Sequence, residues 1–231
     1  MALLLAGSCV SDEANSPSVF SLSYDFAKAD HGWTGDFADY PKEDSIAYEL
    51  LFKHDTLPTN LNNNGTVKAL MTSGINMSDD LFMFIKKKIS GLRPNTVYNI
   101  LFNIRLASNA PTGAVGIGGA PGESVILKAG VTTVEPVKVL DGDSWYRMNV
   151  DKGNQTAAGE DMMNLGNIGV APGTTQYTVI FRNNNSRSPF HFTSDSSGEA
   201  WVVIGTDSGF EGKTTLYYIK IDLLFNEVGP Q

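Results

Sequence analysis

The stretch LFMFIKKKISGLRPNTVYNILFNIRL, residues 81–106, decides the fold class. Apolar side chains occupy every second position in its later half: Tyr98, Ile100, Phe102, Ile104 and Leu106. Only the twofold repeat of an extended backbone places such alternate residues on one face. We therefore predict two antiparallel strands that fold back at residues 91–95. A hairpin with one apolar face needs a second sheet to cover that face in water, which predicts a two-layer β-sandwich.

The same alternation appears near both ends of the chain. In the first part the apolar positions are Phe20, Leu22, Tyr24 and Phe26. In the last part they are Tyr217, Ile219, Ile221, Leu223 and Phe225, with Lys220 and Asp222 facing outward. Further short apolar runs are separated by turn formers, and no helical period exceeds two turns. The prediction is an all-β jelly-roll β-sandwich of about ten to twelve antiparallel strands, forming one domain over residues 19–231.

Composition limits the classes of function. The 231 residues are 42% hydrophobic and 18% charged, as expected for a globular protein with a core. The 17 basic and 25 acidic side chains give a net charge of −8, which argues against a nucleic-acid partner, because binding to phosphates needs clustered Lys and Arg. The one basic run, Lys86–Lys88, is predicted to form a solvated strand edge that blocks aggregation.

The single cysteine, Cys9, excludes an internal disulfide and a thiolate metal site. It follows an apolar stub at residues 3–5 and the small residues 6–8, and a polar run comes after it. This order resembles the end of a bacterial lipoprotein signal, although the stub is shorter than a full signal and lacks a basic start. The alternative is an incidental cysteine. We expect residues 1–18 to be a remnant signal and flexible leader, with Cys9 lipidated and the protein exported and anchored to the bacterial cell envelope, at the outer membrane or surface.

The turn between the strands of the opening stretch has a physical explanation of its own. Pro94 fixes the turn, and Leu92 is expected to close the end of the core. Tyr98 can bury its ring while its hydroxyl binds the backbone of the corner. Such a turn is typical of β-sandwiches in general.

Three features together resemble the galactose-binding-domain-like β-sandwiches, especially carbohydrate-binding modules of that type. They are Asp25-Phe26 followed by Gly32-Trp33, the turn and strand at residues 89–98, and the closing strand at residues 216–224. The resemblance implies that the first and last strands lie side by side. It also implies a structural Ca²⁺ where they meet, with Asp25 and Asp222 as the matching carboxylates. A pair of solvated acids is the alternative.

A sugar-binding site needs aromatic rings for stacking and polar groups for hydroxyls. The candidates for stacking are Trp33, Tyr40, Trp145 and Phe210, and those for hydrogen bonding are Asp36, Asp39, Asp207 and Glu211. The loop at residues 205–212 combines several of them with glycines that would let a ligand approach the backbone. The competing interpretation is that these aromatic residues only pin their loops, and Trp201 is predicted to belong to the core.

The sequence therefore favours a non-catalytic glycan-binding lipoprotein, with a polysaccharide as partner. The alternative is a structural or protein-interaction lipoprotein of the cell envelope. A glycan hydrolase or lyase ranks third, with Asp207 and Glu211 as its carboxylate pair. Signatures of nucleotide binding and of serine hydrolases are incomplete, and no stretch has the ~20 apolar residues of a membrane-spanning helix.

Overall fold

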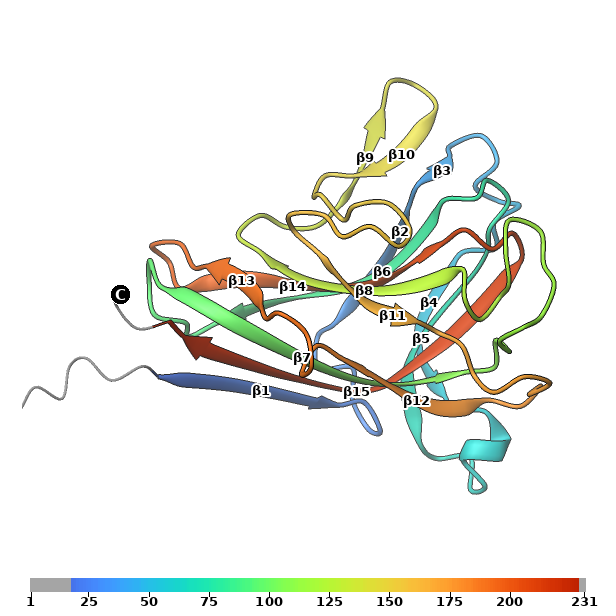
Figure 1. Ribbon diagram of the computed structural model, residues 1–231, viewed down its shortest axis with the longest axis horizontal. Coiled ribbons are helices and arrows are strands. Elements are labelled where there is room, and N and C mark those ends of the chain that lie inside the picture. Colours follow the sequence, from blue (N-terminus) through green and yellow to red (C-terminus); the bar gives the residue numbers. More distant parts are fainter. Residues whose placement is uncertain (1–17, 229–231) are drawn as a thin grey trace, which may run out of the picture.

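Fifteen strands in three sheets make up residues 18–228, the part of the chain that the computed structural model describes (Figure 1). Two of the sheets pack face to face, so the predicted all-β sandwich is confirmed. The strand count is higher than the predicted ten to twelve because short strands such as β3 (Tyr40–Pro41) join residues that were expected to be loops. No helix among residues 18–228 is long and apolar enough to cross a membrane. Helical structure in that range is represented by the 3₁₀ turn η2 (Thr59–Leu61).

Sheet A has seven strands in the order β12-β7-β15-β5-β4, with β1 also paired to β15 and β13 to β7. Its strands are β1 (Val19–Asp25), β4 (Leu51–Thr56), β5 (Lys68–Ile75), β7 (Val97–Ser108), β12 (Thr178–Asn183), β13 (Phe190–Thr193) and β15 (Lys213–Glu227). The strand β15 lies at the centre because β7 pairs along one of its edges, while β5 and β1 share the other.

Sheet B has five strands in the order β11-β8-β14-β6-β2. Its strands are β2 (Thr34–Ala38), β6 (Leu81–Ser90), β8 (Val125–Thr132), β11 (Met163–Asn167) and β14 (Glu199–Ser208). The small sheet C consists of β3, β10 (Trp145–Met148) and β9 (Lys138–Asp141), in the order β3-β10-β9. Figure 1 shows the β9–β10 hairpin projecting beyond sheet B, away from sheet A.

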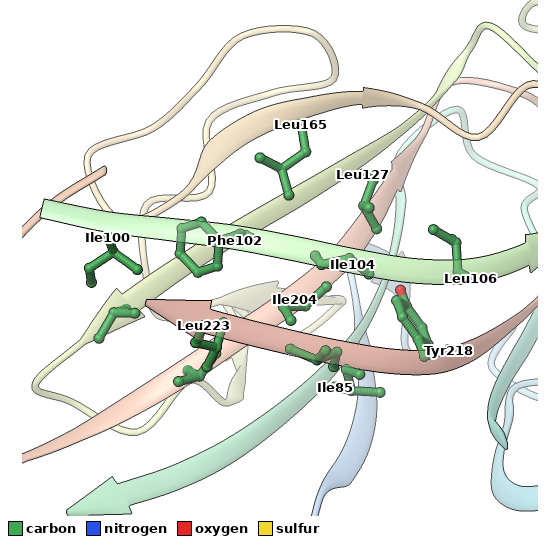
Figure 2. Packing of buried hydrophobic residues seen from close by; sticks show 14 of the residues in the cluster. Ile85, Ile100, Phe102, Ile104, Leu106, Leu127, Leu165, Ile204, Tyr218 and Leu223 are labelled. Carbon is green, nitrogen blue, oxygen red and sulfur yellow. The ribbon is translucent and has the colours of Figure 1, made fainter. Parts of the chain in front are cut away.

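The main core lies between the facing sides of sheets A and B (Figure 2). Ile100, Phe102 and Ile104 of β7 meet Leu127 of β8 and Ile204 of β14 there. Each of these side chains is fully buried. The alternation that predicted one apolar face on β7 is therefore confirmed at the level of side-chain burial.

The pairing of the opening stretch differs from the prediction. The strands β6 and β7 form as expected, but β6 pairs with β14 and β2 in sheet B, whereas β7 pairs with β15, β12 and β13 in sheet A. Residues 91–96 therefore cross from one layer to the other. Both strands turn an apolar face to the same core. The same alternation is therefore expected whether the two strands pair within one sheet or face each other across the core.

The predicted adjacency of the first and last strands is confirmed. β1 pairs antiparallel with β15 along its whole length, from Val19 opposite Asn226 to Asp25 opposite Lys220. In the Figure 1 view, the dark blue arrow of β1 runs beside the dark red arrow of β15. The two ends of the described chain are thus joined within one sheet.

The inward-facing residues of β15 differ in part from those predicted. A bulge between Tyr218 and Lys220 shifts the register. Ile221, Leu223 and Phe225 point into the main core as expected, and Tyr218 joins them. Tyr217 and Ile219 instead pack in a smaller apolar cluster on the other side of the sheet. One extra residue in a strand reverses the facing of everything before it.

The turn before β7 has the predicted contacts. Tyr98 is buried, and its hydroxyl accepts a hydrogen bond from the Arg93 backbone N–H at 2.8 Å. Leu92 is buried in the main core. This corner fixes where the chain enters sheet A.

The basic run Lys86–Lys88 forms the predicted strand edge only in part. The pairing of β2 with β6 ends at Lys86, so Lys87 and Lys88 pair with β14 alone, whereas Lys86 lies between β14 and β2. Lys86 contacts Glu135 at 2.7 Å and lies over the ring of Trp201. Lys87 donates to the His31 carbonyl oxygen, and Lys88 contacts Glu199 at 2.8 Å. Trp201 itself is half-buried on the outer side of sheet B rather than in the core.

The sandwich makes a direct prediction for two phenylalanines on sheet A. Phe102→Ala should lower the free energy of unfolding by about 3–5 kcal/mol, because Phe102 is fully buried between the sheets. Phe181→Ala on β12 should cost less than about 1 kcal/mol, because that ring is 58% exposed. Urea unfolding of both variants measures the difference. Equal losses would contradict the assigned faces.

Candidate functional site

The outer face of sheet A, turned away from the core, carries a row of hydrogen-bonding side chains that crosses four strands. Asn183 of β12 lies opposite Asn103 of β7, Asn103 lies opposite Asp222 of β15, and Asp222 lies opposite Ser23 of β1. Residues directly opposite one another in a sheet point to the same face. The row therefore offers amide, carboxylate and hydroxyl groups side by side to solvent.

A second row supplies an apolar floor next to the first. Leu101 of β7 lies opposite Leu224 of β15, which lies opposite Ser21 of β1. Both leucines are half-buried. The residues of the two rows other than Asn183, together with Leu22, Asn185 and Leu223, line a hollow of about 570 Å³, which we call the sheet A groove. Asn183 lies next to it on β12. A shallow groove with an apolar floor and polar margins suits a ligand that has both apolar faces and hydroxyls.

An exposed aromatic ring stands at the β12 side of this groove. Phe181 lies opposite Arg105 of β7, whose guanidinium carbon is 5.9 Å from the ring centroid. Arg105 in turn lies opposite Lys220, and Lys220 opposite Asp25. Aromatic side chains are enriched in binding surfaces, so the exposed Phe181 ring extends the groove as a candidate contact.

The edge of the groove is held by a buried amide. The Asn184 side chain accepts a hydrogen bond from the Phe102 N–H at 2.8 Å and donates one to the Ile100 carbonyl oxygen at 2.9 Å. Asn184 lies between the end of β12 and the start of β13, both of which pair with β7. Its side chain makes the two hydrogen bonds to β7 that a backbone would make at this point. This anchor fixes the neighbouring Asn183 and Asn185 at the rim.

Asp25 and Asp222, the predicted calcium ligands, lie on this same outer face. Asp222 already contacts the Ser23 hydroxyl at 2.6 Å and the Lys220 ammonium at 2.9 Å, and Asp25 accepts the Ala27 N–H. Among residues 18–228, no group of three or more acidic, histidine or cysteine side chains is arranged to hold a metal ion. Two carboxylates with an ammonium beside them do not by themselves fit Ca²⁺, which prefers six to eight oxygen ligands.

The loop aromatics predicted to stack on sugars lie in different places. Trp33 is buried against Tyr24 and Phe26 in the main core. Tyr40 is buried in a second apolar cluster, with its hydroxyl 3.1 Å from the Lys138 ammonium.

The other two candidate rings are partly exposed. Trp145 lies in sheet C with the Arg147 guanidinium 4.5 Å from its ring centroid. Phe210 packs between two glycines: a Cβ on Gly116 would lie 2.6 Å from its ring, and one on Gly212 would lie 2.5 Å away. The glycines of this loop therefore make room for Phe210.

The predicted polar partners are also dispersed. Asp36 contacts Lys138 at 3.0 Å beside Tyr40. Glu211 is half-buried, and its backbone N–H donates to the Ile117 carbonyl oxygen. Asp39 and Asp207 do come together, because both contact the same lysine, Lys152, in a buried ionic cluster on the outer side of sheet B.

Lys152 is the centre of that cluster. Its ammonium lies 2.9 Å from Asp207 Oδ2 and 3.1 Å from Asp39 Oδ2. The second contact is close without being an aligned hydrogen bond. Lys128 lies 3.0 Å from the same Asp207 oxygen and also donates to the carbonyl oxygens of Lys152 and Ala157. These contacts pin residues 152–157 onto sheet B.

Burial and neighbouring charge act in opposite directions on these groups. Burial is the largest single influence on the pKa of both lysines, and it lowers the pKa of Lys128. For Lys152 burial acts in the same direction, but Asp207 and Asp39 together outweigh it, so the pKa of Lys152 is raised. Burial raises the pKa of Asp39 and, at the mouth of the cluster, that of Asp80. Arg147 bridges the two acids, at 2.7 Å from Asp80 and 3.4 Å from Asp39, above a hollow of about 250 Å³.

The residues of the sheet A groove were not among the predicted ligand-binding residues, apart from Asp222 as a predicted metal ligand. A signal for them was present. The outward positions of the last strand and of residues 99–105 include asparagine, aspartate and leucine beside the charged residues. Their strand partners, however, come from distant parts of the chain.

No family model matches this chain, and no curated protein matches it either. Similar solved structures include a carbohydrate-binding module from the β-sandwich superfamily, 12% identical over 94% of this chain and 75% of its own, with a TM-score of 0.40. A xylan-binding domain from Paenibacillus barcinonensis is 11% identical over 94% of this chain and 99% of its own, with a TM-score of 0.37.

The enzymatically active domain of bacteriophage CBA120 tailspike protein 4 is 12% identical over 81% of this chain, with a TM-score of 0.32, and the chain spans 19% of its length. The resemblance to carbohydrate-binding β-sandwiches that the sequence indicated thus recurs in the structural comparison.

The anchor at the groove edge gives a testable consequence. Asn184→Ala leaves the Phe102 N–H and the Ile100 carbonyl without their partner, and each buried loss costs about 1–3 kcal/mol. We expect the free energy of unfolding to fall by about 2–4 kcal/mol. Asn185→Ala, one residue on and exposed, should change it by less than about 0.5 kcal/mol. Chemical denaturation of both variants checks this, and similar stabilities would refute the anchor.

Proposed function

We propose that this protein is a non-catalytic glycan-binding protein that holds a polysaccharide chain in the sheet A groove. The observation that carries the proposal is the row Asn183–Asn103–Asp222–Ser23, which runs across four neighbouring strands beside a leucine floor. Sugars present alternating apolar ring faces and hydroxyl edges, so they need such a floor with hydrogen-bonding groups along it.

The spacing of the row suits a repeating ligand. Neighbouring strands lie ~4.8 Å apart, which is comparable with the length of one hexose unit in an extended chain. A linear glycan lying across the strands would therefore meet a new hydrogen-bonding side chain at each strand. Phe181 stands at one end of this path and offers a stacking surface, with Arg105 beside it as a donor.

Charge favours a neutral glycan. In the groove, the Asp222 carboxylate is paired with Lys220, and Asn103 and Asn185 carry no charge, nor does Asn183 beside it. The protein as a whole has a net charge of −8, which repels polyanions at long range. An acidic polysaccharide would thus gain little from the groove and lose energy on approach.

The tether belongs to the same proposal. Cys9 and the leader lie outside the described residues, and their role rests on the order of small residues around Cys9 in the sequence. A lipid at Cys9 would hold the protein on the bacterial cell surface, where polysaccharides are met. Metabolic labelling with a fatty acid, with Cys9→Ser as control, tests this attachment.

A protein-contact function is the second candidate, because the apolar side chains of Ile46, Val115 and Ile117 stand largely exposed on loops. Val115 and Ile117 lie two positions apart in one loop, and exposed apolar side chains that form a continuous patch mark interaction surfaces. Such a function would make a protein the main partner, with no dependence on the groove residues.

Affinity gel electrophoresis against a panel of neutral polysaccharides separates these possibilities. We expect retardation by at least one of them, and about tenfold weaker binding for Phe181→Ala and for Asn103→Ala, since losing one good contact costs about 1.4 kcal/mol. Trp145→Ala is the matched control, an aromatic residue outside the groove, and should bind like the wild type.

Three outcomes would count against the groove. Retardation by no polysaccharide would remove the glycan proposal and favour protein contact. Loss of binding in Trp145→Ala with full binding in Phe181→Ala would move the site to the loop aromatics. Undiminished binding in all three variants would exclude both surfaces.

A further inference from the structure

The buried ionic cluster holds the parts of a condensation reaction between two side chains. Lys152 Nζ is 2.9 Å from Asp207 Oδ2, and the two residues are 55 positions apart in the chain. The Asp207 side chain is fully buried, and those of Lys152 and Asp39 are 9% and 5% exposed. The Phe82 ring lies 5.2 Å from the Lys152 ammonium and helps to exclude water.

The two oxygens of Asp207 have different surroundings. Oδ2 accepts the Gln155 N–H at 2.8 Å and lies 3.0 Å from the Lys128 ammonium, so negative charge on it is stabilised from two further directions. Oδ1 is buried and has no hydrogen-bond donor among residues 18–228. One oxygen is therefore held as an oxyanion would be, and the other is free to leave.

Asp39 is placed to carry protons. Its Oδ2 is 3.1 Å from Lys152 Nζ and makes no aligned hydrogen bond within the described part of the chain. Burial raises the pKa of Asp39, which favours its transient protonation. Only the neutral amine is a nucleophile. Because Asp207 and Asp39 raise the pKa of Lys152, the ammonium is the resting form, and the neutral amine forms transiently when Asp39 takes one of its protons.

We propose that Lys152 and Asp207 join in an intramolecular amide bond that fastens residues 149–162 to sheet B. The Nζ lone pair attacks Asp207 Cγ, so an N–C bond forms and the Cγ–Oδ1 bond breaks. Two protons of the Lys152 ammonium end on Oδ1, at least one of them by way of Asp39, and Oδ1 leaves as water. Oδ2 becomes the carbonyl oxygen of the amide. Nothing is oxidised or reduced, and no further reactant is needed.

Such a bond is independent of glycan binding, because it lies on the outer side of sheet B. It would give a covalent link to a chain whose single cysteine rules out an internal disulfide. The link would close a loop of the unfolded chain and so reduce its conformational entropy, as a disulfide does. In the folded protein, the link would protect residues 149–162, which follow β10 of sheet C, from local opening.

Mass spectrometry of the denatured full chain tests the proposal. We expect the wild type to be lighter than its sequence by one water, and a digest to yield a branched peptide that joins Lys152 to Asp207. Lys152→Arg keeps the positive charge but cannot supply a neutral amine, and should show its full sequence mass. Lys213→Arg, an exposed lysine paired with Glu49, is the matched control and should still lack one water.

Asp39→Asn tests the proton carrier, because asparagine tolerates the positive φ of 61° at this position. This variant should show its full mass while its circular dichroism stays that of the wild type. A wild-type mass equal to the sequence mass after purification would overturn the proposal. A branched peptide at Lys128, or loss of water in Asp39→Asn, would overturn the assigned roles.

Discussion

The alternation of side chains along β15 is the constraint on which the rest of the structure depends. This strand pairs with β7 on one edge and with β5 and β1 on the other. Because Ile221, Leu223 and Phe225 must be buried against sheet B, the residues between them must face solvent. The position of Asp222 and Leu224 on the outer face therefore follows from the burial of their neighbours. The proposed binding surface is the reverse side of the core.

Neighbouring strands extend that surface without further devices. Each of β12, β7 and β1 also turns apolar residues inward, so their outward residues come into line with those of β15. Short antiparallel registers, rather than a loop, bring Asn183, Asn103 and Ser23 next to Asp222. A surface built on strands is held by the whole sandwich, which keeps its hydrogen-bonding groups in place before a ligand arrives.

Sheet B uses its outer side differently. Residues 152–157, which follow β10 of sheet C, are fastened to it: Lys128 donates to the carbonyl oxygens of Lys152 and Ala157, and Lys152 donates to Asp207. Each ammonium is surrounded by carbonyl and carboxylate oxygens, which is the condition under which buried charge is tolerated. The outer side of sheet B is thereby occupied by the chain itself, whereas the groove on sheet A stays open.

Sequence periodicity was sufficient for some features and insufficient for others. The burial of residues 98–106, the role of Tyr98 and the pairing of β1 with β15 follow from alternation, local turn chemistry and family resemblance. Periodicity indicates which side of a strand is apolar but not which strand lies beside it. Residues 81–106 were therefore predicted to form one hairpin, although β6 and β7 belong to different sheets. The bulge at Tyr218 carries no sequence marker, because it arises from register with β7.

The site residues were harder to predict for a related reason. Trp33 and Tyr40, which were predicted in loops, are buried by contacts with distant segments. Asp207 was also predicted in a loop, although it lies in β14 beside two lysines. The groove residues belong to four strands far apart in sequence. Their arrangement in a row depends on registers that become visible only when the strands are aligned.

Nuclear Overhauser contacts between the backbones of β1 and β15 in the labelled protein test the central claim most directly. The account predicts contacts that pair Ser23 with Asp222 and Leu22 with Leu223, in one antiparallel register. Contacts of β1 with another strand, or a register shifted by one residue, would contradict it, because Ser23 and Asp222 would then no longer share the outer face.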